Sequence, residues 1–215
     1  MTLKKNWTGI VACGGRSVRM GRDKSRLTYH VLPQREHLFQ MLDMFCSETF
    51  LSCSAEQEAE ADTRFPVIVD HALFEGAGPL TGLLSAMRVN PGKPILLLAC
   101  DYPLLRREDW AAFVGFVDED PSRPAAFYDA EAQSYVPVLG YYPASARQEL
   151  MASVQVPGFS LQRYLKKEAA RKFIPPHADA LISVDDEQMM GWAKEKMKRS
   201  ERDYQEFHSN NNSIQ

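Results

Sequence analysis

The sequence predicts an α/β protein with three layers, in which helices cover both faces of a mostly parallel sheet. Short apolar segments alternate along the chain with segments of helical periodicity, which is the pattern of βαβ units. The run 95–99, Ile-Leu-Leu-Leu-Ala, is apolar throughout, as expected for a strand that is buried on both faces. The length of 215 residues, with 45% hydrophobic and 25% charged residues, is typical of one globular domain.

The first half of the chain alternates regularly between the two kinds of segment. Apolar runs bounded by turn residues predict strands at 9–13, 49–53, 66–69 and 94–99. Apolar residues at helical spacing predict helices at 37–46, 80–89 and 108–117. The acidic segment 56–62 is expected to be a solvated helix.

The pattern changes after Pro121. Two strands, 124–128 and 134–142, are joined by a polar turn and predict a small antiparallel addition to the sheet. Helices at 145–153 and 161–167, a strand at 180–184 and a helix at 187–207 follow. We expect a single domain over residues 1–207 and a disordered, Asn-rich tail over residues 208–215.

Composition excludes several classes of protein. The formal net charge of −3 argues against a general nucleic-acid binder, which needs a basic face. No apolar run approaches the ~20 residues of a membrane span, and the N-terminus lacks the apolar core of a secretory signal. The four cysteines have neither a CxxC nor a zinc-ligand spacing. They are expected to be small core residues in a reducing compartment, so the cytoplasm is the expected location.

The loop after the first predicted strand is the most informative segment. Residues 16–26 carry five basic side chains and one acidic one within an acidic protein. Gly14 and Gly15 let backbone N–H groups approach a ligand, and Arg19 and Lys24 supply positive charge, so the loop suits a polyphosphate. A solvated basic loop is the alternative. Neither the P-loop spacing nor the dinucleotide G-x-G-x-x-G spacing is present.

This loop resembles the signature loop of the MobA-like nucleotidyltransferases, in the sugar-nucleotide-pyrophosphorylase-like superfamily. The matching pattern is Gly14-Gly15-x-Ser17-x-Arg19-Met20-Gly21-x-Asp23-Lys24. The resemblance implies a Rossmann-like sheet of the nucleotide-diphospho-sugar transferase type. It also implies a nucleotide held by Ala12, Cys13, Gly14, Gly15, Ser17 and Lys24. The chain departs from the family at Ala12-Cys13, where relatives usually have Leu-Ala.

A second matching stretch follows the third predicted strand. Asp70 ends this strand, and Gly78, Pro79 and Leu80 belong to a segment that resembles the family's Gly-Pro-Leu-x-Gly turn over the nucleotide base. An ordinary loop and helix start is the alternative. Ser54 stands where the guanylyltransferases have an Asn that contacts base or ribose.

Two acidic residues are candidate ligands of Mg²⁺. Asp101 lies in a stretch that resembles the family's Cys-Asp-x-Pro motif, and Mg²⁺ is held by one or two carboxylates together with phosphate oxygens. Asp185 stands at the second Asn of the family's Asn-x-Asn-Thr-Pro-Glu motif, and Ser183 replaces the first. The alternatives are that Asp101 caps the following helix and that Asp185 or Asp186 caps the last one.

The resemblance implies that GMP is transferred from GTP to the terminal phosphate of molybdopterin, with release of pyrophosphate. Arg19, Lys24 and Asp101 would be catalytic, with Mg²⁺ as cofactor and residues 124–175 on the acceptor side. The expected partners are GTP and a phosphorylated pterin, and molybdenum-insertion proteins or apoenzymes are further candidates. One alternative is a cytidylyltransferase or another nucleotidyltransferase acting on a different phosphorylated metabolite. A catalytically inactive module that binds nucleotide or pterin is the other.

Overall fold

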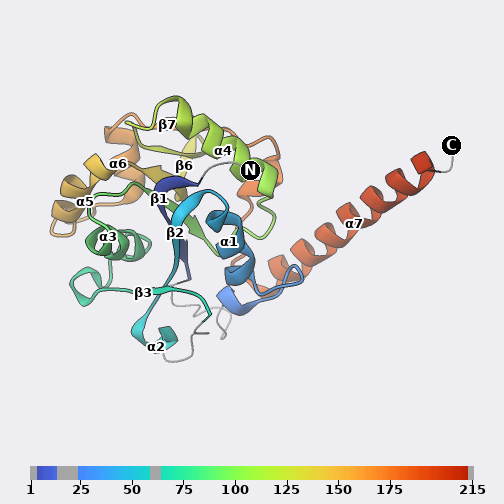
Figure 1. Cartoon of the computed structure of the whole chain (residues 1–215), viewed down its shortest axis with the longest axis horizontal. Coiled ribbons are helices and arrows are strands. Elements are labelled where there is room, and N and C mark those ends of the chain that lie inside the picture. The colour runs from blue at the N-terminus through green and yellow to red at the C-terminus, as the bar shows by residue number, and fades with distance from the viewer. Residues whose placement is uncertain (1–3, 14–23, 59–63, 213–215) are drawn as a thin grey trace.

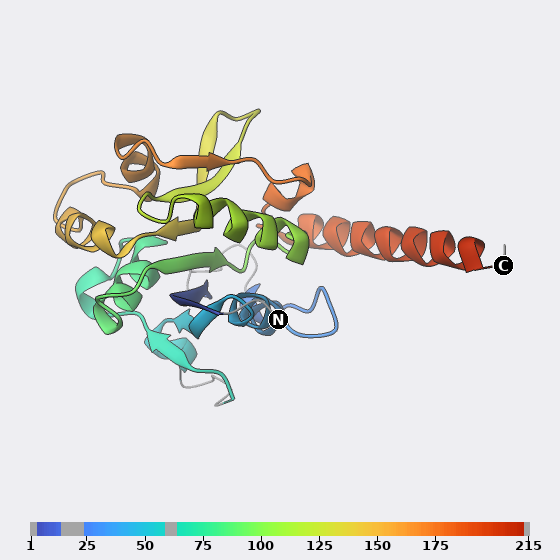
Figure 2. The same ribbon diagram turned by 45° about the horizontal axis from the view of Figure 1, so that its top comes forward.

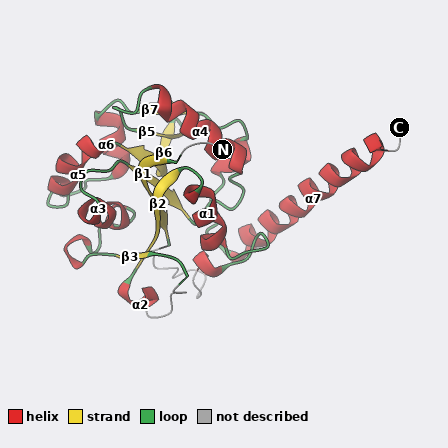
Figure 3. Cartoon of the chain, viewed as in Figure 1, coloured by secondary structure: helices red, strands yellow, loops and turns green. Residues whose placement is uncertain are grey.

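The computed structural model describes residues 4–13, 24–58 and 64–212, and within these residues seven strands form one sheet between two layers of helices (Figures 1 and 3). The strands are β1 (Lys5–Ala12), β2 (Cys46–Cys53), β3 (Val67–Val69), β4 (Ile95–Ala99), β5 (Ala125–Asp129), β6 (Ser134–Tyr142) and β7 (Arg171–Phe173). The α-helices are α1 (Gln34–Asp43), α2 (Ala55–Glu58), α3 (Leu80–Val89), α4 (Arg107–Glu119), α5 (Arg147–Ser153), α6 (Leu161–Lys167) and α7 (Glu187–Asn212). Short 3₁₀ helices are η1 (Lys24–Arg26), η2 (Ala72–Phe74), η3 (Ala144–Ala146) and η4 (Ala178–Leu181).

The sheet has the order β3-β2-β1-β4-β6-β5-β7. Strands β1 to β4 pair in parallel, β6 runs antiparallel to both β4 and β5, and β7 is parallel to β5. The predicted α/β class, with a mostly parallel sheet and a small antiparallel addition, is therefore confirmed.

Alternate residues of each central strand belong to two hydrophobic cores. Val11 on β1 and Leu98 on β4 face the core under α1 and α4, while Ile10 and Leu97 face the core under α3, α5 and α6. All four side chains are fully buried. Because both faces are covered, the central strands read as continuous apolar runs.

The predicted strand at 180–184 is absent, and this prediction is wrong. The segment contains the end of η4 followed by irregular backbone, and the amide of Val184 donates a hydrogen bond to the carbonyl of Asp101. The seventh strand is instead β7, which the sequence did not predict because it has three residues, two of them cationic.

Helix α7 continues to Asn212, beyond the end predicted at residue 207, and projects from the body of the molecule (Figures 1 and 2). Its first turns are anchored by Ala193, which is buried in a small cluster with Leu104 and Val184. Within the described residues, no helix has both the length and the apolar character that crossing a bilayer requires.

Candidate functional site

The parallel strands bring the predicted site residues to one edge of the sheet. Ala12 pairs with Ser52 on one side and with Ala99 on the other, so the ends of β1, β2 and β4 lie side by side. Cys13, Ser54, Asp70 and Asp101 each follow one of the parallel strands at this carboxyl edge. Open α/β sheets bind their ligands at this edge.

Several predicted site residues lie outside the described part of the chain. These are Gly14, Gly15, Ser17 and Arg19, so their predicted roles stay predictions. Lys24 begins η1, which places its backbone shortly before α1. The function predicted for its side chain is likewise not tested by the described structure.

Asp70 is brought against the start of α3. The hydroxyl of Ser52 donates a 2.7 Å hydrogen bond to Oδ1 of Asp70. Burial raises the pKa of Asp70, although the Ser52 hydrogen bond acts in the opposite direction. A Cβ atom at Gly82 would lie 2.5 Å from Oγ of Ser52, so only glycine allows α3 to approach this pair without displacing it. The two stretches that resemble the family, at residue 70 and at residues 76–82, therefore meet in space.

The turn before α3 has a defined conformation. Gly76 and Gly78 have φ angles of +82° and +60°, which favour glycine over residues with a Cβ atom. Thr81 donates a 2.7 Å hydrogen bond from its hydroxyl to the carbonyl of Phe74, across the turn. Pro79 precedes the helix and Leu80 is its first, buried residue. The turn thus presents the backbone of residues 76–79 beside Asp70.

Ser54 takes part in a capping box. Its hydroxyl accepts a 3.3 Å hydrogen bond from the amide of Gln57, and its own amide donates a 3.0 Å bond to the side-chain oxygen of Gln57. The side-chain nitrogen of Gln57 donates to the carbonyl of Cys13 at 3.3 Å. Gln57 therefore joins the end of β1 to the start of α2. The predicted contact of Ser54 with a nucleotide stays a prediction.

Asp101 and Asp185 are brought together by the segments that carry them. The 2.8 Å bond from the Val184 amide to the Asp101 carbonyl holds the irregular segment before α7 against the end of β4. Burial raises the pKa of Tyr102 to about 12, and the carboxylates of both aspartates add to this shift, so both act on the same phenol. The hydroxyl of Ser183 donates a 3.1 Å bond to Oδ2 of Asp185.

Asp101 and Asp185 were also candidates for capping α4 and α7, but other residues cap these two helices. Helix α4 starts after Arg106, whose amide donates to Asp109 at 3.1 Å, so Asp101 does not cap it. Helix α7 is capped by Asp186, which accepts a 2.8 Å bond from the amide of Met189. Asp101 and Asp185 are therefore not explained as helix caps.

The donor set at this place suits Mg²⁺. In the described part of the chain, no group of three His, Cys, Asp or Glu side chains converges as in a closed metal site. Mg²⁺ does not require such a group, because one or two carboxylates, waters and substrate phosphates complete its shell. Asp101 and Asp185 are the residues that could hold it.

Sequence reasoning missed two residues at this edge. Gln57 could have been found, because Ser-x-x-Gln before a helix is a capping-box pattern. Arg35 had no such signal, because the helix was predicted to begin at residue 37. It lies with Cys13, Cys53 and Gln57 around a small cavity of about 10 Å³, and its buried Nε has no hydrogen-bond partner among the described residues. Arg35 adds a cation to the edge where a polyphosphate is predicted.

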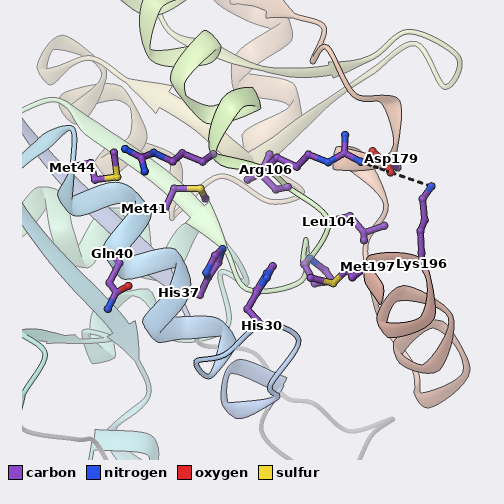
Figure 4. A pocket seen from close by; sticks show the side chains of 13 residues that line it. His30, His37, Gln40, Met41, Met44, Leu104, Arg106, Asp179, Lys196 and Met197 are labelled. Atoms are coloured by element: carbon purple, nitrogen blue, oxygen red, sulfur yellow. Dashed lines mark hydrogen bonds and ion pairs between the residues drawn. The ribbon is translucent and has the colours of Figure 1, made fainter. Parts of the chain in front are cut away.

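A pocket of about 380 Å³ lies elsewhere, between α1, the loop before α4 and α7 (Figure 4). Asp179 accepts from Arg106 at 3.1 Å and from Lys196 at 3.0 Å on one side of it. The rings of His30 and His37 stack at 3.7 Å between centroids on another side. None of the predicted site residues lines this pocket.

The stacked histidines predict a pH-dependent stability. Burial, with a smaller contribution from His30, lowers the pKa of His37 to about 4 from its ordinary value of 6.5. The unfolded chain then binds a proton more readily than the folded chain between these values. The contribution of neutral His37 to the unfolding free energy is therefore fully present above about pH 6.5 and is lost as the pH falls toward 4.

We expect His37→Gln to reduce the slope of unfolding free energy against pH over this window. Urea unfolding at half-unit steps of pH measures it. Gln40→Ala changes a pocket residue that does not titrate, so it should keep the wild-type slope. An unchanged slope in His37→Gln would contradict the lowered pKa.

A mostly parallel, doubly wound sheet with a half-buried carboxylate and two further aspartates at its carboxyl edge is typical of a ligand-binding α/β protein. A family model describes the chain more closely. Residues 9–175 match the MobA-like NTP transferase domain, so the chain belongs to this family and is a nucleotidyltransferase.

Relatives of known name agree with this membership. The chain is 26% identical over 189 residues to the protein of Nostoc sp. named "Probable molybdenum cofactor guanylyltransferase", covering 84% of this chain and 86% of that protein. It is 35% identical over 94 residues to the "Molybdenum cofactor biosynthesis bifunctional protein" of Synechocystis sp.. That second match spans 43% of this chain and only 26% of the bifunctional protein.

Two solved structures show the same fold. Molybdopterin-guanine dinucleotide biosynthesis protein A of Archaeoglobus fulgidus has a TM-score of 0.71 at 18% identity, covering 89% of this chain and 99% of that chain. Rv0371C of Mycobacterium tuberculosis, in complex with manganese, has a TM-score of 0.63 at 17% identity, also covering 89% and 99%. These likenesses confirm the expected α/β fold with a mostly parallel sheet.

Proposed function

We propose that the chain transfers GMP from GTP to the terminal phosphate of molybdopterin and releases pyrophosphate, with Mg²⁺ as cofactor. The observation that supports this proposal is the hydrogen bond from Val184 to Asp101, which holds the segment of Asp185 against the end of β4, where both carboxylates act on Tyr102. The names of the relatives support the choice of substrates. The expected cytoplasmic location and the expected molybdenum-insertion or apoenzyme partners stay predictions.

The reaction needs little proton chemistry from the protein. An oxygen of the acceptor phosphate forms a bond to the α-phosphorus of GTP while the bond from that phosphorus to the bridging oxygen of pyrophosphate breaks. A phosphomonoester has lost most of its second proton at pH 7, so no dedicated general base is required. The chain's task is to align the two substrates and to stabilise the charge that passes to the leaving group.

Each described segment has a part in this alignment. The turn at residues 76–79, supported by Asp70 and Gly82, would present backbone groups to the guanine. Asp101 and Asp185 would hold Mg²⁺, which when bound would neutralise charge on the transferred phosphate. Gly14, Gly15, Arg19 and Lys24 would bind the leaving pyrophosphate, and Arg35 would add positive charge near them.

Nucleotide choice is the direct test of the proposed substrate. We expect calorimetric titration with Mg²⁺ to show tighter binding of GTP than of CTP, and pyrophosphate release to require a phosphorylated pterin. Tighter binding of CTP would favour the cytidylyltransferase alternative. Tight nucleotide binding without pyrophosphate release, with any acceptor, would favour the inactive binding module.

The adjacent aspartates before α7 allow a matched comparison. We expect Asp185→Ala to lower kcat about tenfold, since part of the proposed metal shell is lost, with little change in stability. Asp186→Ala removes the helix cap and should lower the unfolding free energy by about 1 kcal/mol while kcat is kept. Steady-state kinetics and urea unfolding of both variants measure the difference. Equal kcat in the two variants would contradict a role for Asp185 in metal binding.

A further inference from the structure

Three cysteines lie in one row at the carboxyl edge of the sheet. The strand register pairs Ala12 with Ser52 and with Ala99, and the residues that follow these three are Cys13, Cys53 and Cys100. Alternate residues of a strand point to opposite faces, which puts these three residues on the same face as Val11. Cys13 and Cys100 accordingly both pack in the core under α1 and α4.

Cys13 and Cys100 are in direct contact. Their sulfur atoms are 3.7 Å apart, with the thiol of Cys100 donating to the sulfur of Cys13. The thiol of Cys13 in turn donates to the carbonyl of Val11 at 3.6 Å. The backbones are also tied, because the amide of Cys100 donates to the carbonyl of Ala12 at 3.3 Å. None of the four cysteines, all of which lie in the described residues, forms a disulfide in this structure.

This arrangement is close to that of a disulfide. Neighbouring strands lie about 4.8 Å apart, which is within the range of Cα separations that a disulfide spans. The two sulfurs would have to approach from 3.7 Å to about 2.05 Å, which changes in side-chain rotation and a small strand movement can supply.

The two thiols differ in access to solvent. Cys13 is half-buried, whereas Cys100 is 5% exposed. An oxidant therefore reaches Cys13 first, and Cys100 is placed to react with the product.

We propose that Cys13 and Cys100 form a reversible disulfide under peroxide and that this bond inhibits nucleotidyl transfer. The sulfur of Cys13 attacks one oxygen of hydrogen peroxide, the O–O bond breaks, and a sulfenic acid and one water are produced. The sulfur of Cys100 then displaces the sulfenic hydroxyl, which forms the S–S bond and releases a second water. Two thiols are oxidised and one peroxide is reduced to two waters.

The inhibitory effect rests on the proposed function. Cys100 precedes Asp101, and Cys13 precedes the glycines of the signature loop and accepts a hydrogen bond from Gln57. Drawing the two sulfurs together therefore moves both sides of the proposed site. A displacement of about 1 Å can cost up to about 10²-fold in rate, so we expect turnover to fall between tenfold and 10²-fold.

Thiol chemistry of the full chain tests the bond without reference to activity. After hydrogen peroxide and its removal by catalase, we expect two of the four thiols to be lost, and a non-reducing digest to contain linked peptides of Cys13 and Cys100. Dithiothreitol should restore four thiols. A Cys13–Cys53 link, irreversible oxidation of Cys13, or four unchanged thiols would each overturn the proposal.

Variants then test the effect on turnover. For each variant, the turnover of the oxidised protein is compared with the turnover of the same protein after reduction. Cys100→Ala and Cys100→Ser should lose the sensitivity to peroxide, whereas Cys53→Ala and Cys46→Ala should keep it. Sensitivity retained in both Cys100 variants would overturn the proposed effect. A chain that forms the bond but has no turnover in either state would contradict the proposed function and leave the disulfide established.

Discussion

Asp101→Asn is expected to lower kcat for pyrophosphate release about 10³-fold. The amide keeps the size of the side chain but removes the negative charge that a hard cation requires. Because Asp101 follows β4 and does not cap α4, its loss should leave the fold unchanged. Turnover at saturating GTP over a range of Mg²⁺ concentrations measures the effect.

Asp43→Asn is the matched control for this prediction. Asp43 lies at the end of α1, near the opposite edge of the sheet, where it forms an exposed ion pair with Lys4. Exposed pairs contribute little to stability, so kcat should stay within twofold of wild type. A folded Asp101→Asn variant, by circular dichroism, with turnover like that of Asp43→Asn would rule out Asp101 as a metal ligand for the reaction.

The second large effect is expected for Lys24→Ala. The resemblance of the signature loop implies that its ammonium group stabilises negative charge on the leaving pyrophosphate. Loss of one preorganised charge of this kind lowers kcat about 10²–10³-fold. Single-turnover measurement of pyrophosphate release separates this loss of chemistry from slower product release.

Lys93→Ala provides the control for Lys24. Lys93 lies just before β4, at the amino edge of the sheet, and pairs with Glu48 at 2.9 Å. Its removal should not change kcat, whereas Lys24→Arg should recover part of the rate because the positive charge is kept. Near-normal turnover of a folded Lys24→Ala variant would count against the assignment of the loop.

In the described part of the chain, stretches that resemble the family are separated in sequence and meet in the fold. Asp70 and Gly82 belong to different predicted elements, and they meet because Ser52 lies between them. The segments of Asp101 and Asp185 meet because one backbone hydrogen bond joins them. Such contacts depend on how elements pack, and no local pattern of residues contains this information.

The residues that cap α4 and α7 were also decided by the tertiary structure. The sequence left Asp101 open as a helix cap and left Asp185 and Asp186 equally open for α7. The structure assigns the caps to Arg106 with Asp109 and to Asp186. A helix cap is the residue whose carboxylate accepts a hydrogen bond from an amide in the first turn. The sequence does not show which of two adjacent aspartates does so, because this depends on the direction of the backbone before the helix.

The sequence by itself determined the α/β class, the helices 80–89 and 161–167, and the strand 134–142, because hydrophobic periodicity and turn residues act locally. It also identified the family, because the signature loop is a continuous segment. Only the tertiary structure showed β7, the irregular course of residues 182–184 and the row of three cysteines. Short strands and contacts between strands are stabilised by partners that are distant in sequence, so the packed sheet decides them.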